Sequence, residues 1–251
     1  MRKFNKVFVI ALPRCATVSM CDALGMLGIR TAHLGRIYGE QSVEHNHPER
    51  LMRMHEQIQA DDFGLDILRS CDGLADYPAC ASSVFVRLDK QYPGSLFINV
   101  RRDSDPSKWL QSVERQFRGL ELLKLGKQST SEEKAFMRTM QSFRCMTFGQ
   151  VEFSAEVFQA AYYRYQDFVA DYFAGRPQDL LQIPDVSVLD DEGFGPLCKF
   201  LECDIAHGEF PCRNDHSQRP HQAFMSALSA GKIKSLTGIQ PEPRPTSVEL
   251  S

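Results

Sequence analysis

The chain has 251 residues, of which 43% are hydrophobic and 24% charged, and its formal net charge is −3 at pH 7. A chain of this length and apolar content can bury one large core. Its 29 Lys and Arg residues do not exceed its 32 Asp and Glu residues, which argues against a general nucleic-acid-binding protein. An anionic ligand would therefore have to be held by a few precisely placed cations.

The first expected element is a buried strand over residues 6–11, rich in Val, Phe and Ile. A turn at 12–16 leads into a helix over 17–27, which ends at Gly28. A strand, a tight turn and a helix in this order are typical of an α/β fold that holds an anion at the helix N-terminus.

The later elements follow from the same patterns and from Gly and Pro positions. Strands are expected at 29–33, within 72–78, at 95–100 and at 180–183, and helices at 48–59, 82–91, 105–117, 131–147, 152–174 and 193–201. Residues 34–47 are polar and His-rich, as in an exposed loop. Alternating strands and helices predict a parallel sheet covered by helices. We expect a single domain over 1–217 and a polar, Pro-containing tail over 218–251.

The compartment is inferred from what the chain lacks. No run of 18 apolar residues occurs, and the apolar segment near the N-terminus is too short to span a membrane. The eight cysteines show no Cys-x-x-Cys spacing, which favours free thiols in a reducing compartment. We interpret the chain as a soluble cytoplasmic protein with no membrane partner.

The loop after the first strand does not match the nucleotide-kinase pattern Gly-x-x-x-x-Gly-Lys-(Ser/Thr). The four defining positions hold Ala11, Ala16, Thr17 and Val18. Because no hydroxyl stands where Mg²⁺ would be held, ordinary ATP or GTP chemistry is not expected. The loop offers one cation, Arg14, and it could hold a phosphosulfate, whose transferred sulfuryl group carries a single negative charge and needs no metal.

Cys15 suggests a competing interpretation. A thiol beside Arg14 at a helix N-terminus is expected to have a lowered pKa, as in a thiol-dependent phosphatase. That loop, however, needs an arginine six positions after the cysteine, where this chain has Cys21. The spacing therefore excludes the phosphatase.

Three blocks of sequence carry a resemblance to a known family. KVFVIALPRCATVSMCDALGMLGI resembles the start of the sulfotransferase superfamily, where a strand leads into a Pro-(Arg/Lys)-x-Gly-Thr-x-Ser loop. DGLADYPACASSVFVRLDKQYPGSLFINVRRDSDPSKWLQSV is similar to its second block, and FGPLCKFLECDIAHGEFPCRND to its third. The blocks occur in the family's order and look most like its small, soluble, uncharacterised members.

The resemblance implies a three-layer fold like that of P-loop NTPases, with a central parallel sheet flanked by helices. It implies a sulfotransferase that moves a sulfuryl group from 3′-phosphoadenosine 5′-phosphosulfate to a hydroxyl or amine of a small-molecule or glycan-type acceptor. The reaction would be an in-line displacement that releases adenosine 3′,5′-bisphosphate and requires no metal. No nucleic acid polymer is implied as a partner.

The resemblance also implies which residues contact the donor. The 5′-phosphosulfate would be wrapped by Arg14, Cys15, Ala16, Thr17, Val18 and Ser19. The 3′-phosphate would be held by Ser112 and either Arg101 or Arg102, because two extra residues separate the arginine from the Trp-x-x-Ser motif. Arg213 and Asn214, in the third block, are further candidate contacts. Ala16 replaces the family's glycine, and its methyl group would crowd the phosphate.

Two residues are candidates for the base that takes the acceptor's proton. Asp76 lies where related carbohydrate sulfotransferases carry an acidic base, and it is the preferred candidate of the two. His33 ends the second strand, on the same expected sheet edge as Arg14. His45 and His47 are expected to be ordinary loop residues and not metal ligands.

Two other functions stay open at this point. The missing loop glycines are compatible with a non-catalytic nucleotide-binding protein of the same fold or with a degenerate P-loop kinase. The acceptor is not specified by any motif. Aromatic residues of the two long helices, such as Phe136 and Phe143, are expected to pack in the core more than to line an acceptor pocket, and Trp109 is also expected in the core.

Overall fold

The computed structural model describes residues 1–40, 47–102, 105–124, 130–204 and 209–211, and for 118–124 it describes the backbone alone. Its strands are β1 (Val7–Val9), β2 (Thr31–His33), β3 (Arg36–Ile37), β4 (Gly73–Ala75), β5 (Leu96–Val100) and β6 (Leu180–Ile183). Its α-helices are α1 (Thr17–Met26), α2 (Pro48–Gln59), α3 (Ser82–Gln91), α4 (Ser107–Lys124), α5 (Ser131–Phe148), α6 (Ala155–Phe173), α7 (Ser187–Glu192) and α8 (Gly195–Leu201). The expected tail over 218–251 lies outside the described residues.

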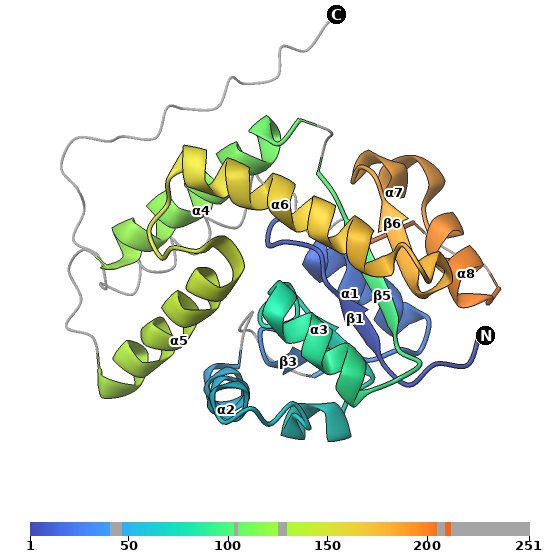
Figure 1. Cartoon of the computed structure of the whole chain (residues 1–251), viewed down its shortest axis with the longest axis horizontal. Helices are drawn as coiled ribbons and strands as arrows, with labels where there is room; N and C mark the ends of the chain where they lie inside the picture. The colour runs from blue at the N-terminus through green and yellow to red at the C-terminus, as the bar shows by residue number, and fades with distance from the viewer. Residues whose placement is uncertain (41–46, 103–104, 125–129, 205–208, 212–251) are drawn as a thin grey trace, which may run out of the picture.

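One sheet organises the described part of the chain, with the strand order β3-β2-β4-β1-β5-β6. All neighbouring strands pair in parallel except β2 and β3, which are antiparallel. Helix α1 lies behind the sheet and packs on β2 and β4, whereas α3 and α6 lie in front of it (Figure 1). The chain therefore has the expected α/β fold, a largely parallel sheet between helical layers.

The core in front of the sheet is aromatic. Phe97 of β5 packs against Phe8 of β1, Phe85 of α3 and Phe173 of α6, with ring centroids 5.5, 6.3 and 4.9 Å away. Large rings suit this layer because each buries a large apolar area at a fixed geometry. The packing fixes β1 and β5 against each other, so the loops that follow these two strands begin from a rigid base.

A second aromatic cluster joins the long helices. Trp109 of α4 is fully buried and packs against Tyr162 of α6 and Phe148 at the end of α5, at 4.9 and 6.0 Å between ring centroids. The expectation that Trp109 lies in the core is confirmed. Its indole N–H also donates to the Pro13 carbonyl at 2.9 Å, and it thereby ties α4 to the loop after β1.

One strand and one α-helix were not expected from the sequence. The segment 34–47 was interpreted as a loop, but its first residues form β3 after a turn at Leu34 and Gly35, whose φ angles are 48° and 82°. Leucine rarely adopts this left-handed conformation, so the hairpin signal was weak. Helix α7 was also missed, because it is a single short helix without an apolar periodicity. Helix α4 extends to Lys124, beyond the expected end at residue 117.

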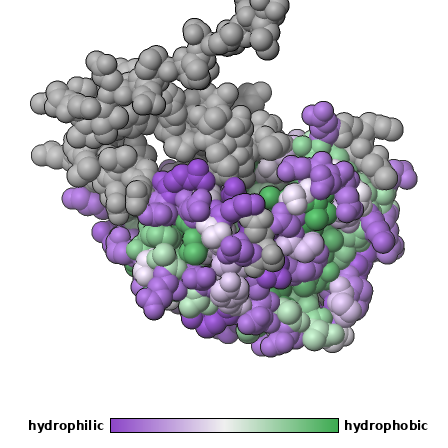
Figure 2. Space-filling model, turned by 90° about the horizontal axis from the view of Figure 1, so that it is seen from above, coloured by the Kyte–Doolittle hydropathy of each residue, from purple (hydrophilic) through white to green (hydrophobic). Residues whose placement is uncertain are grey.

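Few large apolar side chains are exposed on the described part of the surface. Figure 2 shows one face on which purple, hydrophilic residues surround scattered apolar ones. Among the described residues the exposed large hydrophobic side chains are Met1, Met26, Tyr163 and Phe168. Within the same residues, no helix combines the length and the apolar character that a membrane crossing would require.

Candidate functional site

The loops that follow β1, β2, β4 and β5 all lie at the carboxyl edge of the sheet, because these strands are parallel. In open α/β sheets this edge is where ligands bind. It carries Arg14 after β1, His33 at the end of β2, Asp76 after β4 and Arg102 after β5. Residues far apart in the sequence are thus brought to one place.

The loop between β1 and α1 is held from several sides. Tyr165 of α6 donates to the Ile10 carbonyl, Trp109 to the Pro13 carbonyl, and the Cys15 N–H to the Leu12 carbonyl at 3.1 Å. Ala16 is the N-cap of α1, and no side chain caps the helix there. The first N–H groups of α1 therefore have no side-chain acceptor at the cap, which suits a bound anion.

The loop contains two residues in the left-handed backbone region, Arg14 at φ 73° and Ala16 at φ 55°. This conformation costs roughly 1–2 kcal/mol for a residue with a Cβ atom. Glycine, which the sulfotransferase resemblance expects at position 16, would adopt it without that cost. The departure from the family pattern thus appears in the structure as a strained alanine.

Replacing Ala16 by glycine should stabilise the protein. The relief of about 1–2 kcal/mol is partly offset by about 0.4–1 kcal/mol of extra freedom in the unfolded chain, so we expect a melting temperature about 1–4 °C higher. Thermal denaturation measures this directly. The matched control is Ala23→Gly inside α1, which should lower the melting temperature. A lower melting temperature for Ala16→Gly would contradict the strain.

Two arginines meet at one serine on the β5 side of this loop. Arg14 Nε donates to Ser112 Oγ at 3.1 Å, and Arg102 Nη1 donates to the same oxygen and to the Arg14 carbonyl, both at 3.3 Å. A hydroxyl oxygen has two lone pairs and can accept both bonds. Burial lowers the pKa of Arg14, and the neighbouring charge of Arg102 lowers it further. An anion near both guanidinium groups would offset this repulsion.

Arg101 takes a different position from Arg102. Its backbone N–H donates to the Ile183 carbonyl of β6 at 2.9 Å, and its side chain meets Tyr162 of α6. Its Nε is buried and has no hydrogen-bond partner among the described residues. The structure therefore brings Arg102 to Ser112 and leaves a donor of Arg101 unused. The nearby Asp105 accepts bonds from the Ser107 N–H and hydroxyl and so caps α4.

The expectation for the thiol of Cys15 is wrong. The side chain is fully buried, and burial raises its pKa to about 12. Burial disfavours the thiolate more strongly than the nearby arginines favour it. The Cys15 side chain thus belongs to the core and not to the loop surface that an anion would touch.

A second cluster lies at the ends of β2 and β4, on the opposite side of β1 from β5. Thr17 Oγ1 donates to Asp76 Oδ2 at 2.9 Å and lies 3.2 Å from His33 Nε2, and His33 Nε2 lies 3.4 Å from Asp76 Oδ2. The other carboxylate oxygen of Asp76 accepts from the Tyr77 N–H at 2.8 Å. The two candidate bases are therefore neighbours that share contacts with one threonine.

The environment of Asp76 has opposing effects on its pKa. Burial raises the pKa, but the hydrogen bond and charge of His33, together with the bonds from Tyr77 and Thr17, outweigh it and leave the pKa below its ordinary value. Asp76 is therefore held as a carboxylate, and it is a weak proton acceptor. A carboxylate in this state orients a histidine and stabilises its protonated form.

The comparison with known protein families gives a match over most of the chain. A family model described as the sulfotransferase domain matches residues 6–219. The chain belongs to the sulfotransferase family. No curated protein matches it.

The remaining predicted residues of this sulfotransferase are placed as follows. Thr17 and Ser19 are buried in the first turn of α1, and Val18 is half-buried. Arg213 and Asn214 lie outside the described residues, as does His45. His47 is the N-cap of α2, where its ring accepts from the Arg50 N–H. The sequence analysis had assigned Thr17 only to contact with the donor. In the structure its hydroxyl donates to Asp76.

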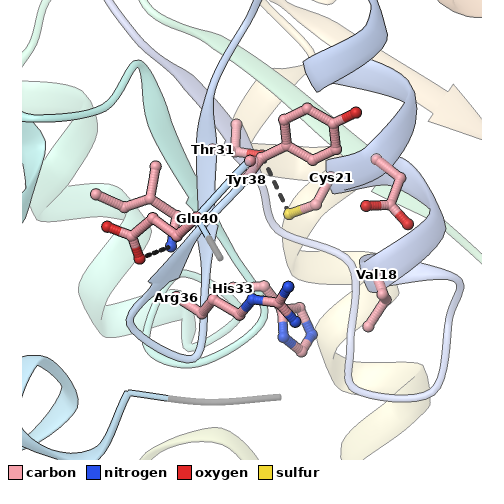
Figure 3. A pocket seen from close by; sticks show the side chains of 10 residues that line it. Val18, Cys21, Thr31, His33, Arg36, Tyr38 and Glu40 are labelled. Atoms are coloured by element: carbon pink, nitrogen blue, oxygen red, sulfur yellow. Dashed lines mark hydrogen bonds between the residues drawn. The ribbon is translucent and has the colours of Figure 1, made fainter. Parts of the chain in front are cut away.

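One cavity of the sulfotransferase is lined by His33, and another is lined by sequence neighbours of the site residues. The first, of about 290 Å³, lies between α1, which carries Val18 and Cys21, and the β2–β3 hairpin, which carries His33 and Arg36 (Figure 3). We name it the hairpin cavity. Its wall combines polar and apolar side chains and includes both acidic and basic groups.

The second cavity, of about 140 Å³, lies where the site loops meet α4 and α5, and we name it the α4–α5 cavity. Pro13, Leu34 and Tyr77 form the side of it that faces the site. Its remaining wall is mostly apolar and comes from the two helices. Sequence reasoning did not find this cavity, because its lining residues follow the ordinary apolar pattern of core-facing helices.

Proposed function

We propose that this sulfotransferase moves a sulfuryl group from 3′-phosphoadenosine 5′-phosphosulfate to a hydroxyl or amine of a small acceptor. The observation that carries the proposal is the position of α1 between two unlike clusters. One side of its N-terminus meets Arg14, Ser112 and Arg102, which suit an anionic donor. The other side meets His33 and Asp76, which suit proton transfer.

The residues present fit a donor with two separate phosphate groups. The uncapped N-terminus of α1 and Arg14 would hold the 5′-phosphosulfate, and Arg102 and Ser112 would hold the 3′-phosphate. The buried Nε of Arg101, which lacks a described partner, offers a further donor nearby. An electrically negative chain can bind such a donor because only these few cations are needed.

The chemistry then requires one proton transfer. His33 would accept the acceptor's proton while the acceptor oxygen or nitrogen bonds to sulfur and the bond between sulfur and the phosphate oxygen breaks. Adenosine 3′,5′-bisphosphate leaves with that electron pair. Asp76 holds the imidazole and stabilises the charge that His33 gains. We assign the base to His33 and not to Asp76, because the hydrogen bonds that Asp76 accepts hold the pKa of Asp76 below its ordinary value and make it a weak proton acceptor.

The assignment of Arg102 to the 3′-phosphate is tested by comparing two nucleotides. Arg102→Ala should weaken adenosine 3′,5′-bisphosphate by roughly 10- to 150-fold and AMP far less, because the lost charge-assisted contact is worth about 1.5–3 kcal/mol. Isothermal titration calorimetry measures both affinities. Arg101→Ala is the matched neighbour and should change the ratio less than threefold. The reverse result would assign the phosphate to Arg101.

The activity itself is tested with ³⁵S-labelled donor and a panel of phenols, alcohols and amines, without Mg²⁺. We expect label transfer to at least one acceptor class. Tight binding of adenosine 3′,5′-bisphosphate without any turnover would indicate a nucleotide-binding protein and would contradict the enzyme. Binding of ATP that strictly requires Mg²⁺, with no binding of the bisphosphate, would instead support a kinase.

A further inference from the structure

Arg144 of α5 is a buried cation without an anionic partner in the described part of the chain. Its side chain is 6% exposed, and its contact there is with the Phe117 ring, whose centroid lies 4.4 Å from the guanidinium carbon. No hydrogen bond or ion pair joins it to another described residue. Burying a charge is costly unless it is paired, and one aromatic ring replaces little of the lost hydration. Such a residue indicates a ligand that supplies the missing charge.

Arg144 forms part of the wall of the α4–α5 cavity. The rest of the wall contributed by the helices is apolar apart from Gln116, and its apolar members are Val113, Phe117, Phe136, Met137, Met140 and Phe148. A cavity of about 140 Å³ is close in size to an engineered apolar cavity of ~150 Å³ that binds benzene. The cavity thus suits a group the size of one aromatic ring, next to a single positive charge.

The cavity adjoins the proposed transfer site. Three of its lining residues each directly neighbour a site residue in the sequence: Pro13 precedes Arg14, Leu34 follows His33, and Tyr77 follows Asp76. A ligand in the cavity therefore lies against the loops that would hold the sulfuryl group and the base. A short acceptor could place its apolar part in the cavity and its hydroxyl at the site.

We propose that the α4–α5 cavity binds the acceptor, and that the acceptor is a small hydroxylated molecule with a ring-sized apolar part and a carboxylate held by Arg144. The role of this ligand as acceptor rests on the proposed sulfuryl transfer. The binding of the ligand to the cavity does not depend on that transfer. The hairpin cavity suits such an anion less well, because the carboxylates of Asp22 and Glu40 contribute to its wall.

The test compares two phenols that differ only in charge. The probes are 3-(4-hydroxyphenyl)propanoate and 3-(4-hydroxyphenyl)propanamide, titrated by calorimetry into the protein with and without saturating adenosine 3′,5′-bisphosphate. The wild-type protein should bind the carboxylate at least ~10-fold more tightly than the amide, as expected for one charge-assisted pair. Arg144→Met should abolish that preference, and Arg144→Lys should keep part of it.

Arg36→Met is the matched control, because it removes a cation from the hairpin cavity and should leave the preference unchanged. Equal binding of the two probes to the wild type, or a preference that survives Arg144→Met, would overturn the inference. So would loss of the preference in Arg36→Met. Removing an unpaired buried charge should not lower the melting temperature of Arg144→Met, which separates a binding role from a structural one.

Affinity for adenosine 3′,5′-bisphosphate is measured on the same variants and should not change in Arg144→Met. If the wild type fails to bind the nucleotide, the proposed function fails. The comparison of the probes without nucleotide then still decides whether Arg144 holds a carboxylate. The two ideas can therefore fail separately.

Discussion

Replacing Arg14 by alanine will weaken the binding of adenosine 3′,5′-bisphosphate by roughly 30-fold to several thousand-fold. The guanidinium group is half-buried and bonds to Ser112, and truncating one member of the charge pair that it would form with the bound phosphate costs about 2–5 kcal/mol. Calorimetry or equilibrium dialysis without Mg²⁺ gives the affinity. Arg14 has a left-handed backbone conformation, which is equally unfavourable for alanine and arginine. The substitution should therefore leave the shape of the loop unchanged.

The control for this experiment removes the same charge elsewhere. Arg53→Ala on α2 deletes an exposed arginine that pairs with Asp66 and Glu56, and it should leave nucleotide affinity within about twofold of the wild type, as for most surface changes. If Arg14→Ala binds the nucleotide as tightly as Arg53→Ala does, the donor is not held by the loop after β1. The proposed position of the 5′-phosphosulfate would then be wrong.

Replacing His33 by glutamine should lower turnover by roughly 10²- to 10⁴-fold, the usual contribution of a positioned base. Glutamine can still donate a hydrogen bond to Asp76 but cannot take up a proton. Binding of adenosine 3′,5′-bisphosphate should remain unchanged, because Arg102 and Ser112 lie on the β5 side of β1 and His33 lies on its β4 side. The measurement is the single-turnover rate with labelled donor and the best acceptor of the panel, together with the bisphosphate affinity.

His55→Gln provides the matched comparison. His55 lies on α2 and bonds to the Ser142 hydroxyl at 2.8 Å, and its loss should affect neither turnover nor nucleotide binding. If His33→Gln retains full turnover while Asp76→Asn loses it, Asp76 is the base, and the alternative left open by the sequence is the correct one. A melting curve of each variant shows whether a loss of rate reflects a loss of folding.

The local pattern of the chain predicted the strand, turn and helix around Arg14 because each element has its own signal. A buried strand appears in the sequence as a short apolar run. The end of α1 is marked by Gly28, which follows the helix and has a positive φ angle. The β3 strand was not predictable in the same way. Its hairpin depends on Leu34 in a conformation that leucine seldom adopts, and the Leu34 side chain packs against the hydrophobic core.

The choice between Arg101 and Arg102 shows where sequence reasoning ends. Neighbouring residues at the end of a strand point to opposite sides, so a shift of one position moves a side chain from one environment to another. Only the folded chain shows that Arg102 meets Ser112 and that Arg101 meets Tyr162. Cys15 is a similar case. Its position beside Arg14 predicted a thiol with a lowered pKa, whereas its burial in the folded chain raises that pKa.

The sequence by itself determined a net charge of −3, from which we predicted that any anion would be held by a few local arginines, and it indicated the loop after the first strand as the place for them. Only the tertiary structure shows which side chains these residues contact. Arg14 and Ser112 are 98 positions apart and Thr17 and Asp76 are 59 apart, so no local pattern records their contact. It also exposed Arg144 as a buried charge without a described partner, because burial and pairing are properties of packing that a helical residue pattern does not contain.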